Sequence, residues 1–146
     1  MIAPLLAAGA ALEAEDKSGW RALHLAAVNG HASTAEALLA AGAALEAEAN
    51  LGLRALHLAA MNGHASTVEA LLAAGATLEA ETKDGWRPIH LAAAKGYGPV
   101  LAKLIAAGAD LAAATKDGES ALLLAESGGH SGAVEVIQAA GGVGLG

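Results

Sequence analysis

One block of sequence occurs three times at a fixed spacing, and it constrains the fold more than any other feature. Residues 21–27 read Arg-Ala-Leu-His-Leu-Ala-Ala, the same seven residues recur at 54–60, and the variant Arg-Pro-Ile-His-Leu-Ala-Ala stands at 87–93. Each copy begins 33 residues after the one before. A constant period of this length indicates one supersecondary unit that cannot bury its apolar face alone and stacks on its neighbours. The spacing therefore predicts a solenoid.

Glycines divide each unit into two short helices and a turn. In the first unit Gly30 follows Asn29 and Gly42 follows an apolar run, and each has a counterpart 33 residues on. A left-handed residue at such a place ends a helix. Gly19 closes a tight turn in a hairpin that projects from the stack. We therefore expect helices near 22–29 and 32–41, repeated at the same period.

Taken together, the block, its period and its glycines resemble the ankyrin repeat over nearly the whole chain, although Arg-Ala-Leu-His stands where that family usually has Thr-Pro-Leu-His. The resemblance implies an all-α solenoid with short β-hairpin turns. In this register the units are a truncated N-terminal half repeat at 1–15, repeats at 16–48, 49–81 and 82–114, and a degenerate C-terminal capping repeat at 115–146. Residues 4–15 match 37–48 at all but the first position, so this segment is the second half of a repeat, which suggests a domain cut from a longer array or a deliberately minimal array.

The last unit differs from the others. Outer helices are expected to carry the apolar pairs Leu38 and Leu39 and their counterparts, but Gln138 replaces the second leucine in the fourth unit. A polar residue there suits a terminal repeat, beyond which nothing stacks. The glycine-rich end at 141–146 is expected to fray.

Composition disfavours several classes of partner. The net charge is −7 and the chain has no Lys/Arg run, so an electrostatic grip on nucleic acid is not expected. No apolar run approaches the about 20 residues that a membrane helix needs, so we expect no membrane insertion. Absence of cysteine excludes disulfides and thiol chemistry and fits a cytoplasmic protein. With 2% aromatic residues, the core should consist of alanine and leucine.

The six histidines fall at two positions of the repeat: His24, His57 and His90 at one, and His31, His64 and His130 at the other. The first set is expected to bond backbone groups between neighbouring repeats, and the second to help cap the outer helices. A metal site is the alternative. It is disfavoured because the period explains every histidine and no Asp or Glu stands at ligand spacing.

Nothing in the sequence indicates catalysis. The pairs Ser33-Thr34 and Ser66-Thr67 are expected to be helix caps rather than nucleophiles. No nucleophile–base–orienter set is present, and the glycine-rich tail lacks the strand and helix of a phosphate site. We therefore expect no enzyme activity, no cofactor and no small-molecule substrate.

Arginines and glutamates change together along the chain. Arg21, Arg54 and Arg87 each follow a turn, and two glutamates precede each turn, at 13 and 15, 46 and 48, and 79 and 81. In the fourth unit the arginine becomes Ser120 and both glutamates become alanine. This joint loss predicts Arg–Glu ion pairs across or between hairpins. The alternative is a solvated stripe without partners, because exposed pairs contribute little.

Two nearly identical repeats indicate where a partner would bind. Repeats 16–48 and 49–81 differ at seven positions, four of them in the hairpin tip, with abrupt changes such as Trp20 against Leu53. Neutral drift at exposed loops is the alternative. Trp20, Leu53 and Trp86 share one repeat position and should form a row of anchors, or else pack on the arginine stems. The candidate protein-binding residues are Lys17, Ser18, Trp20, Val28, Asn29, Asn50, Leu51, Leu53, Met61, Asn62, Lys83, Asp84, Trp86 and Lys95.

The resemblance implies a non-catalytic scaffold that binds a protein partner through its hairpin tips and the concave face of its inner helices. A structural spacer or a regulatory segment cut from a larger enzyme or channel is the first alternative. An engineered ankyrin-type binder is the second, although the alanine-rich outer helices and Arg-Ala-Leu-His differ from the consensus that designers favour.

Overall fold

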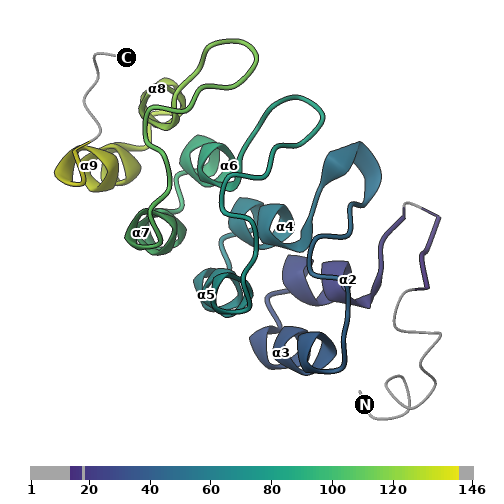
Figure 1. The fold of residues 1–146 in the computed structure, drawn as a ribbon. Coiled ribbons are helices and arrows are strands. Elements are labelled where there is room, and N and C mark those ends of the chain that lie inside the picture. The colour runs from purple at the N-terminus through teal and green to yellow at the C-terminus, as the bar shows by residue number, and fades with distance from the viewer. Residues whose placement is uncertain (1–13, 18, 142–146) are drawn as a thin grey trace.

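The computed structural model describes residues 14–17 and 19–141 of the 146-residue chain. This part contains helices in consecutive pairs, and one pair follows another at the period seen in the sequence (Figure 1). The pairs are α2 (Ala22–Val28) with α3 (Ala32–Ala40), α4 (Ala55–Met61) with α5 (Ala65–Ala73), α6 (Pro88–Lys95) with α7 (Gly98–Ala106), and α8 (Ala121–Ser127) with α9 (Ser131–Ala139). The expected helix bounds agree with these to within a residue or two.

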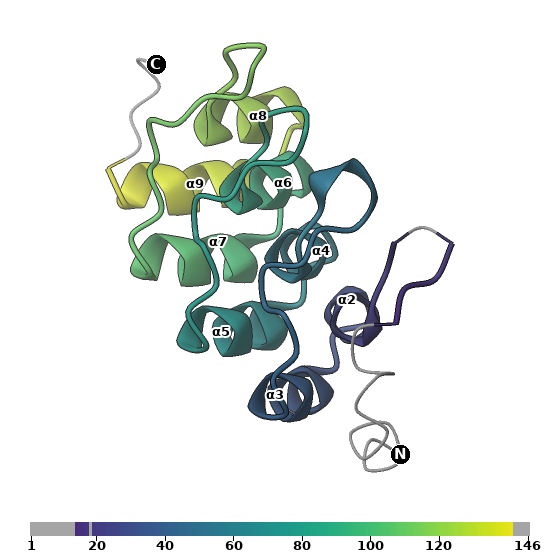
Figure 2. The ribbon, with the colours of Figure 1, turned by 45° about the vertical axis from the view of Figure 1, so that its right-hand side comes forward.

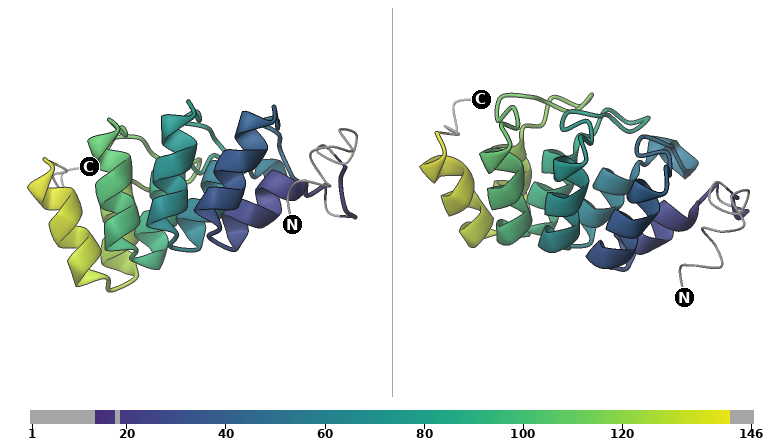
Figure 3. Two further views of the ribbon diagram at one scale, coloured as in Figure 1. Left: turned by 90° about the horizontal axis from the view of Figure 1, so that it is seen from below. Right: turned by 60° about the horizontal axis from the view of Figure 1, so that its bottom comes forward.

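The helices form two rows, as stacking of a repeated unit requires. The inner row consists of α2, α4, α6 and α8, the outer row of α3, α5, α7 and α9, and each helix packs on the next in its own row (Figures 1 and 2). Seen from below, the pairs lie side by side in one line (Figure 3). The predicted helical solenoid is confirmed.

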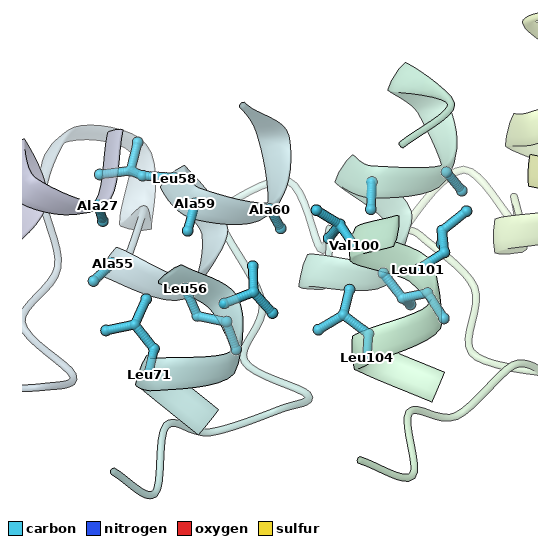
Figure 4. Close-up of a cluster of buried hydrophobic side chains, with 14 of the residues drawn as sticks. Ala27, Ala55, Leu56, Leu58, Ala59, Ala60, Leu71, Val100, Leu101 and Leu104 are labelled. Atoms are coloured by element: carbon cyan, nitrogen blue, oxygen red, sulfur yellow. The ribbon is translucent and has the colours of Figure 1, made fainter. Parts of the chain in front are cut away.

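Small side chains let the helices approach closely. Ala27, Ala59 and Ala60 of the inner row are fully buried, and leucines such as Leu56 and Leu71 fill the space between the rows. Figure 4 shows part of this cluster, in which residues of α4 gather with residues of α5 and α7. A core of alanine and leucine therefore replaces the aromatic residues that the chain lacks.

The last outer helix carries a polar side chain at a position that is apolar in the earlier repeats. Leu38, Leu71, Leu104 and Ile137 are each fully buried at the same repeat position, whereas Gln138 beside the last of these is exposed. Its counterparts in the earlier repeats are half-buried against the next outer helix. The polar residue thus occupies a surface that the earlier repeats use for stacking.

Between the pairs, the chain forms projections that we call finger 1 (residues 16–20, of which Ser18 is not described), finger 2 (49–53), finger 3 (82–86) and finger 4 (115–119). In finger 3 the Thr82 N–H donates to the Trp86 carbonyl at 2.9 Å, and the Gly85 N–H donates to the Thr82 carbonyl at 2.9 Å. Instead of regular β-hairpins, the fingers are tight turns, with an isolated bridge between Ala114 and Ser120 as the only strand-type pairing in the described part. The chain enters the next helix directly after each turn, so strands have no room to extend.

Two expectations concern residues outside the described part. Most of the expected half repeat, residues 1–13, and the end of the tail, residues 142–146, are not described. Among the helices that are described, none has the length and apolar character needed to cross a membrane.

Candidate protein-binding surface

A line of buried histidines joins the inner helices α2, α4 and α6 to the chain that follows each of them. His24, His57 and His90 accept at Nδ1 from the backbone N–H of the arginine three residues earlier, at 2.8 to 2.9 Å. The Nε2 atoms donate to the carbonyls of Ala47, Ala80 and Ala113 at 2.9, 2.8 and 3.0 Å. Both ring nitrogens are thus used, and the ring must be neutral to accept at Nδ1. The first histidine set bonds backbone groups, as expected.

Burial favours this neutral form in two of the rings. It lowers the pKa of His57 and of His90 below the ordinary value of 6.5, and the hydrogen bond to the alanine carbonyl opposes the shift only in part. The neighbouring guanidinium of Arg54 or Arg87 also lowers the pKa of its histidine. A charged ring at these places would lie in the core beside another cation.

The second histidine set does not cap the outer helices, so that expectation is wrong. His31, His64 and His130 occupy the N-cap positions of α3, α5 and α9 but make no side-chain cap hydrogen bond. Instead, His64 Nε2 donates to the Val28 carbonyl at 2.9 Å and His130 Nε2 donates to the Ala94 carbonyl at 3.0 Å. The His64 and His130 rings thus bond the inner helix of the preceding repeat, whose last carbonyls lack partners within that helix.

The expected serine and threonine caps are also wrong. The outer helices begin at the residue before each Ser-Thr pair, so these hydroxyls lie inside the first turn, and the Thr67 hydroxyl is buried without a hydrogen-bond partner. A serine cap occurs elsewhere, where Ser120 accepts from the Leu123 N–H at 3.1 Å at the start of α8. Ser120 stands at the position that carries arginine in the other repeats.

The predicted Arg–Glu ion pairs are present in all three repeats. Each arginine bonds glutamates that precede its own turn, and the arginine side chains are only about a quarter exposed. The N–O distances are 2.9 Å for Arg21–Glu15, 3.0 and 3.3 Å for Arg54 with Glu46 and Glu48, and 3.1 and 3.4 Å for Arg87 with Glu79 and Glu81. The alternative of a solvated basic stripe is thereby excluded.

In the second and third repeats, one glutamate of the pair also reaches the next repeat. The second oxygen of Glu46 accepts from the Thr77 N–H at 2.7 Å, and that of Glu79 accepts from the Asp110 N–H at 2.7 Å. Each of these carboxylates thus bridges an arginine of its own finger and a backbone amide 31 residues further on. The ion pairs and amide bonds together fix the spacing of neighbouring fingers.

Finger 2 has a different turn from its neighbours. In fingers 1, 3 and 4 the first side chain, that of Asp16, Thr82 or Thr115, accepts from the backbone N–H four residues later. Ala49 holds this position in finger 2 and cannot accept, and residues Asn50–Gly52 form a 3₁₀ turn. Within it Leu51 adopts φ +66°, and it is the only non-glycine residue with positive φ in the described part.

The candidate binding residues separate by exposure. The finger tips and the ends of the inner helices are exposed, namely Lys17, Asn29, Asn50, Leu51, Asn62, Lys83, Asp84 and Lys95. Trp20, Val28, Leu53, Met61 and Trp86 are half-buried. Ser18 lies outside the described residues. Leu51 is 57% exposed, while Trp20, Leu53 and Trp86 each keep only part of their surface open.

The structure brings four of the six apolar candidate residues together at one place. A hollow of about 330 Å³ between fingers 2 and 3 is lined by Leu51, Leu53, Met61, Thr82, Asp84, Trp86 and Leu91. The Trp86 ring meets the His90 ring edge-on, with centroids 6.3 Å apart, and this contact holds the indole at the wall of the hollow. Trp20, on finger 1, is not part of this site.

A comparison with family sequence models settles the relationship of the chain. The model of ankyrin repeats, in three copies, matches residues 1–82 and 56–142. The chain belongs to the ankyrin-repeat family. A comparison with curated proteins finds no match. Ankyrin repeats are generally protein–protein interaction modules and typically non-catalytic, which agrees with the general class of function expected from the sequence.

Two candidate residues have a structural role within these ankyrin repeats. Asn29 donates from its side-chain amide to the Leu25 carbonyl at 2.9 Å, and Asn62 donates to the Leu58 carbonyl at 2.7 Å. These bonds close the C-terminal ends of α2 and α4, so each side-chain amide already uses one of its N–H groups within the repeat. In the part of the chain that the structure describes, no three His, Asp or Glu side chains converge as a metal site would require.

Sequence reasoning missed Thr82 and Leu91 in the lining of the hollow. Leu91 belongs to the same recurring position as Leu25 and Leu58, which are 46% and 2% exposed. A repeat position with such variable exposure carries no signal in the sequence. Comparison of Ala49 with Asp16, Thr82 and Thr115 was the available hint that finger 2 differs.

Proposed function

We propose that this ankyrin-repeat chain is a non-catalytic scaffold that binds a protein partner through its finger tips and the exposed face of its inner helices. The observation that supports the proposal is the row of Trp20, Leu53 and Trp86, which remain half-buried at the bases of successive fingers. The chain has only two tryptophans, and both stand in this row. Half-exposed tryptophans are characteristic anchors of protein interfaces.

The fingers that carry this row are well suited to recognition because they are held in place. Each of fingers 1 to 3 is followed by an arginine bonded to glutamates before its turn, and the carboxylates of Glu46 and Glu79 bond the next repeat. A surface that is ordered before binding loses less conformational entropy on association. We further propose that repeats 16–48, 49–81 and 82–114 form the binding unit, and that 115–146 acts as its cap.

A pull-down with a matched control tests the proposal. The tagged chain, a Trp20→Ala/Trp86→Ala variant and a Lys103→Ala variant would be incubated with a lysate of the source cells, and retained proteins identified by mass spectrometry. Lys103 lies on the outer helix α7, away from the fingers, where its ammonium bonds Glu69 at 3.0 Å. We expect a protein retained by the wild-type and Lys103→Ala chains and lost from the double tryptophan variant. Circular dichroism confirms that all three chains are helical.

The same experiment separates a binder from a structural spacer. A spacer holds other parts of an assembly apart, and its retained proteins should not depend on the tryptophan row. If the retained proteins are the same for all three chains, the tryptophan row is not a binding surface and the proposal fails.

A further inference from the structure

We propose that the hollow between fingers 2 and 3 receives one large apolar side chain of a partner segment that carries a Lys or Arg within about two residues of it. This inference rests on the proposed scaffold function and adds the chemistry of the partner. In this proposal Leu51, Leu53, Met61 and Trp86 contact the partner's apolar side chain, and the Asp84 carboxylate bonds the partner's Lys or Arg.

The hollow has the dimensions and lining of a site for one side chain. Its volume of about 330 Å³ is at the low end for ligand sites, and its walls are apolar except for Thr82 and Asp84. The Thr82 hydroxyl already accepts from the Trp86 N–H at 3.2 Å. Burial of an aliphatic or aromatic group is therefore the interaction that most of the lining offers.

Leu51 supplies the strongest local sign of a binding site. At the same repeat position fingers 3 and 4 carry Asp84 and Asp117, which are polar and do not have positive φ. Leu51 instead combines an exposed apolar side chain with φ +66°, a conformation that is unfavourable for a branched residue. Strain of this kind is found mainly at binding and catalytic sites. The exposed apolar side chain and the strained backbone thus occur at one residue of the lining.

Contacts between the two fingers form the hollow before any partner arrives. The Lys83 N–H donates to the Leu51 carbonyl at 3.1 Å, which joins finger 3 to finger 2. A Cβ atom at Gly52 would lie 3.1 Å from the Lys83 nitrogen, so glycine permits this approach. The tip of finger 2 is thereby held against finger 3, with Leu51 in the lining of the hollow.

Asp84 determines the charge of the partner. Its side chain is exposed at the rim and makes no hydrogen bond or ion pair within the described residues. It is therefore free to bond an incoming ammonium or guanidinium group beside a desolvated apolar contact, where such a bond is stronger than in water. The net charge of −7 also favours approach of a basic segment.

A second copy of this chain does not provide the required pattern. The large hydrophobic residues that are exposed in the described part are Leu25, Leu51 and Leu123, and none has a Lys or Arg within two residues. Four half-buried leucine, isoleucine or tryptophan residues do have one, namely Trp20, Leu53, Trp86 and Ile105, but each of these cations is already bonded to a glutamate. The occupant is accordingly a different protein.

Selection of peptides from a random phage-displayed library on the full chain tests the inference. We expect enriched peptides to contain Leu, Met, Phe or Trp with Lys or Arg within two residues. Binding of one synthetic enriched peptide would then be followed by Trp86 fluorescence in a Trp20→Phe background. Leu51→Gly should weaken binding by about tenfold or more because it removes an apolar anchor. Leu51→Gly also relieves the φ strain, so the loss cannot be attributed to unfolding.

Two further variants complete the experiment. Leu123→Asp alters another exposed leucine, on α8 in the capping repeat outside the proposed binding unit, and should leave peptide affinity unchanged. Asp84→Asn should weaken binding of the basic peptide about threefold or more and reduce its salt dependence, since one charge pair is lost.

The outcomes are distinct. Enriched peptides that bind Leu51→Gly as tightly as wild type but bind Trp20→Ala weakly would overturn this inference and leave the scaffold function intact. Failure to enrich any peptide would also overturn it, whereas the scaffold function is decided by the pull-down. Sedimentation that detects a wild-type dimer and a Leu51→Gly monomer would replace the proposed partner by a second copy.

Discussion

The Nε2 atom of His57 lies 2.8 Å from the carbonyl oxygen of Ala80, 23 residues further along the chain. With the Arg54 N–H donating to Nδ1 at 2.9 Å, one neutral ring connects the start of an inner helix to the segment that leads into the next finger. His90 makes the same pair of bonds. We expect these two buried rings to make the array sensitive to acid.

We expect stability to fall as the pH decreases below about 6.5. Burial lowers the pKa of His57 and His90 in the folded chain from the ordinary 6.5, so the unfolded chain binds more protons just below that pH. Each histidine then removes up to about 1.4 kcal/mol of unfolding free energy per pH unit, until its folded pKa is reached. Urea unfolding followed by circular dichroism between pH 7.5 and 5 measures this.

A double His57→Leu/His90→Leu variant is the matched control, since Leu123 holds the same position in the fourth repeat. The variant loses the bonds to Ala80 and Ala113, but its stability should depend less on pH. A wild-type chain that becomes more stable as the pH falls from 6.5 to 5.5 would contradict the assigned sign.

Replacing Glu46 should destabilise the array more than replacing Glu48. Both carboxylates bond Arg54, at 3.0 and 3.3 Å, but only Glu46 also accepts from the Thr77 N–H. Glu46→Ala leaves that amide without its protein acceptor, and we expect it to lower the unfolding free energy by about 1 kcal/mol more than Glu48→Ala. Urea titration of both variants makes the comparison, and equal losses would show that the amide bond contributes nothing.

Arg54→Ala should loosen finger 2 more than it lowers the melting temperature. The Arg54 pairs are partly exposed, and such pairs contribute about 1 kcal/mol or less to global stability. Local opening should nevertheless increase at the Ala49 and Gly52 amides, which bond within the turn at 2.7 and 3.1 Å. Hydrogen exchange at these amides is the measurement, with Lys95→Ala, at the exposed end of α6, as control. Unchanged exchange at both amides would argue against a positioning role of the arginine.

Gly30→Ala should be more destabilising than Gly129→Ala. Both glycines have nearly the same left-handed backbone, with φ +73° and +72°, and alanine there costs about 1–2 kcal/mol. At Gly30 the new Cβ would also lie 2.5 Å from the His64 ring, whereas at Gly129 it meets no atom within 4 Å. Displacement of His64 breaks its bond to the Val28 carbonyl, which adds about 1 kcal/mol or more. Thermal unfolding of the two variants gives the difference, which should vanish in a His64→Ala background.

Hydrogen exchange should be slowest in the second and third repeats and fastest at residues 128–141. The pairs α4–α5 and α6–α7 have neighbours on both sides, whereas α9 packs chiefly on α7 and α8 and has no repeat beyond it in the described part. Gly128, Gly129 and Gly132 further weaken the last helices, because glycine lowers helix stability. Protection in α9 equal to that in α5, measured by NMR at pH 7, would disagree with this gradient.

The sequence alone determined the parts of this protein that depend on local pattern and strict period. Helix ends follow from glycines that must be left-handed, and the stacked architecture follows from a block recurring every 33 residues. The pairing of Arg54 with Glu46 and Glu48 could also be predicted, because all three residues flank one turn. Once the turn is fixed, charged side chains that flank it have few other partners within reach.

Only the tertiary structure decided which hydrogen-bond partner a polar side chain takes when one lies in its own repeat and another in the neighbouring repeat. His64 stands at a helix start, where capping is the local choice, yet it bonds Val28 in the preceding repeat. Stacking brings an unpartnered carbonyl within reach, and burial makes that bond preferable to an exposed cap. The hollow beside Leu51 likewise arises only when fingers 2 and 3 touch, because its walls come from residues that are distant in the chain and are placed by packing.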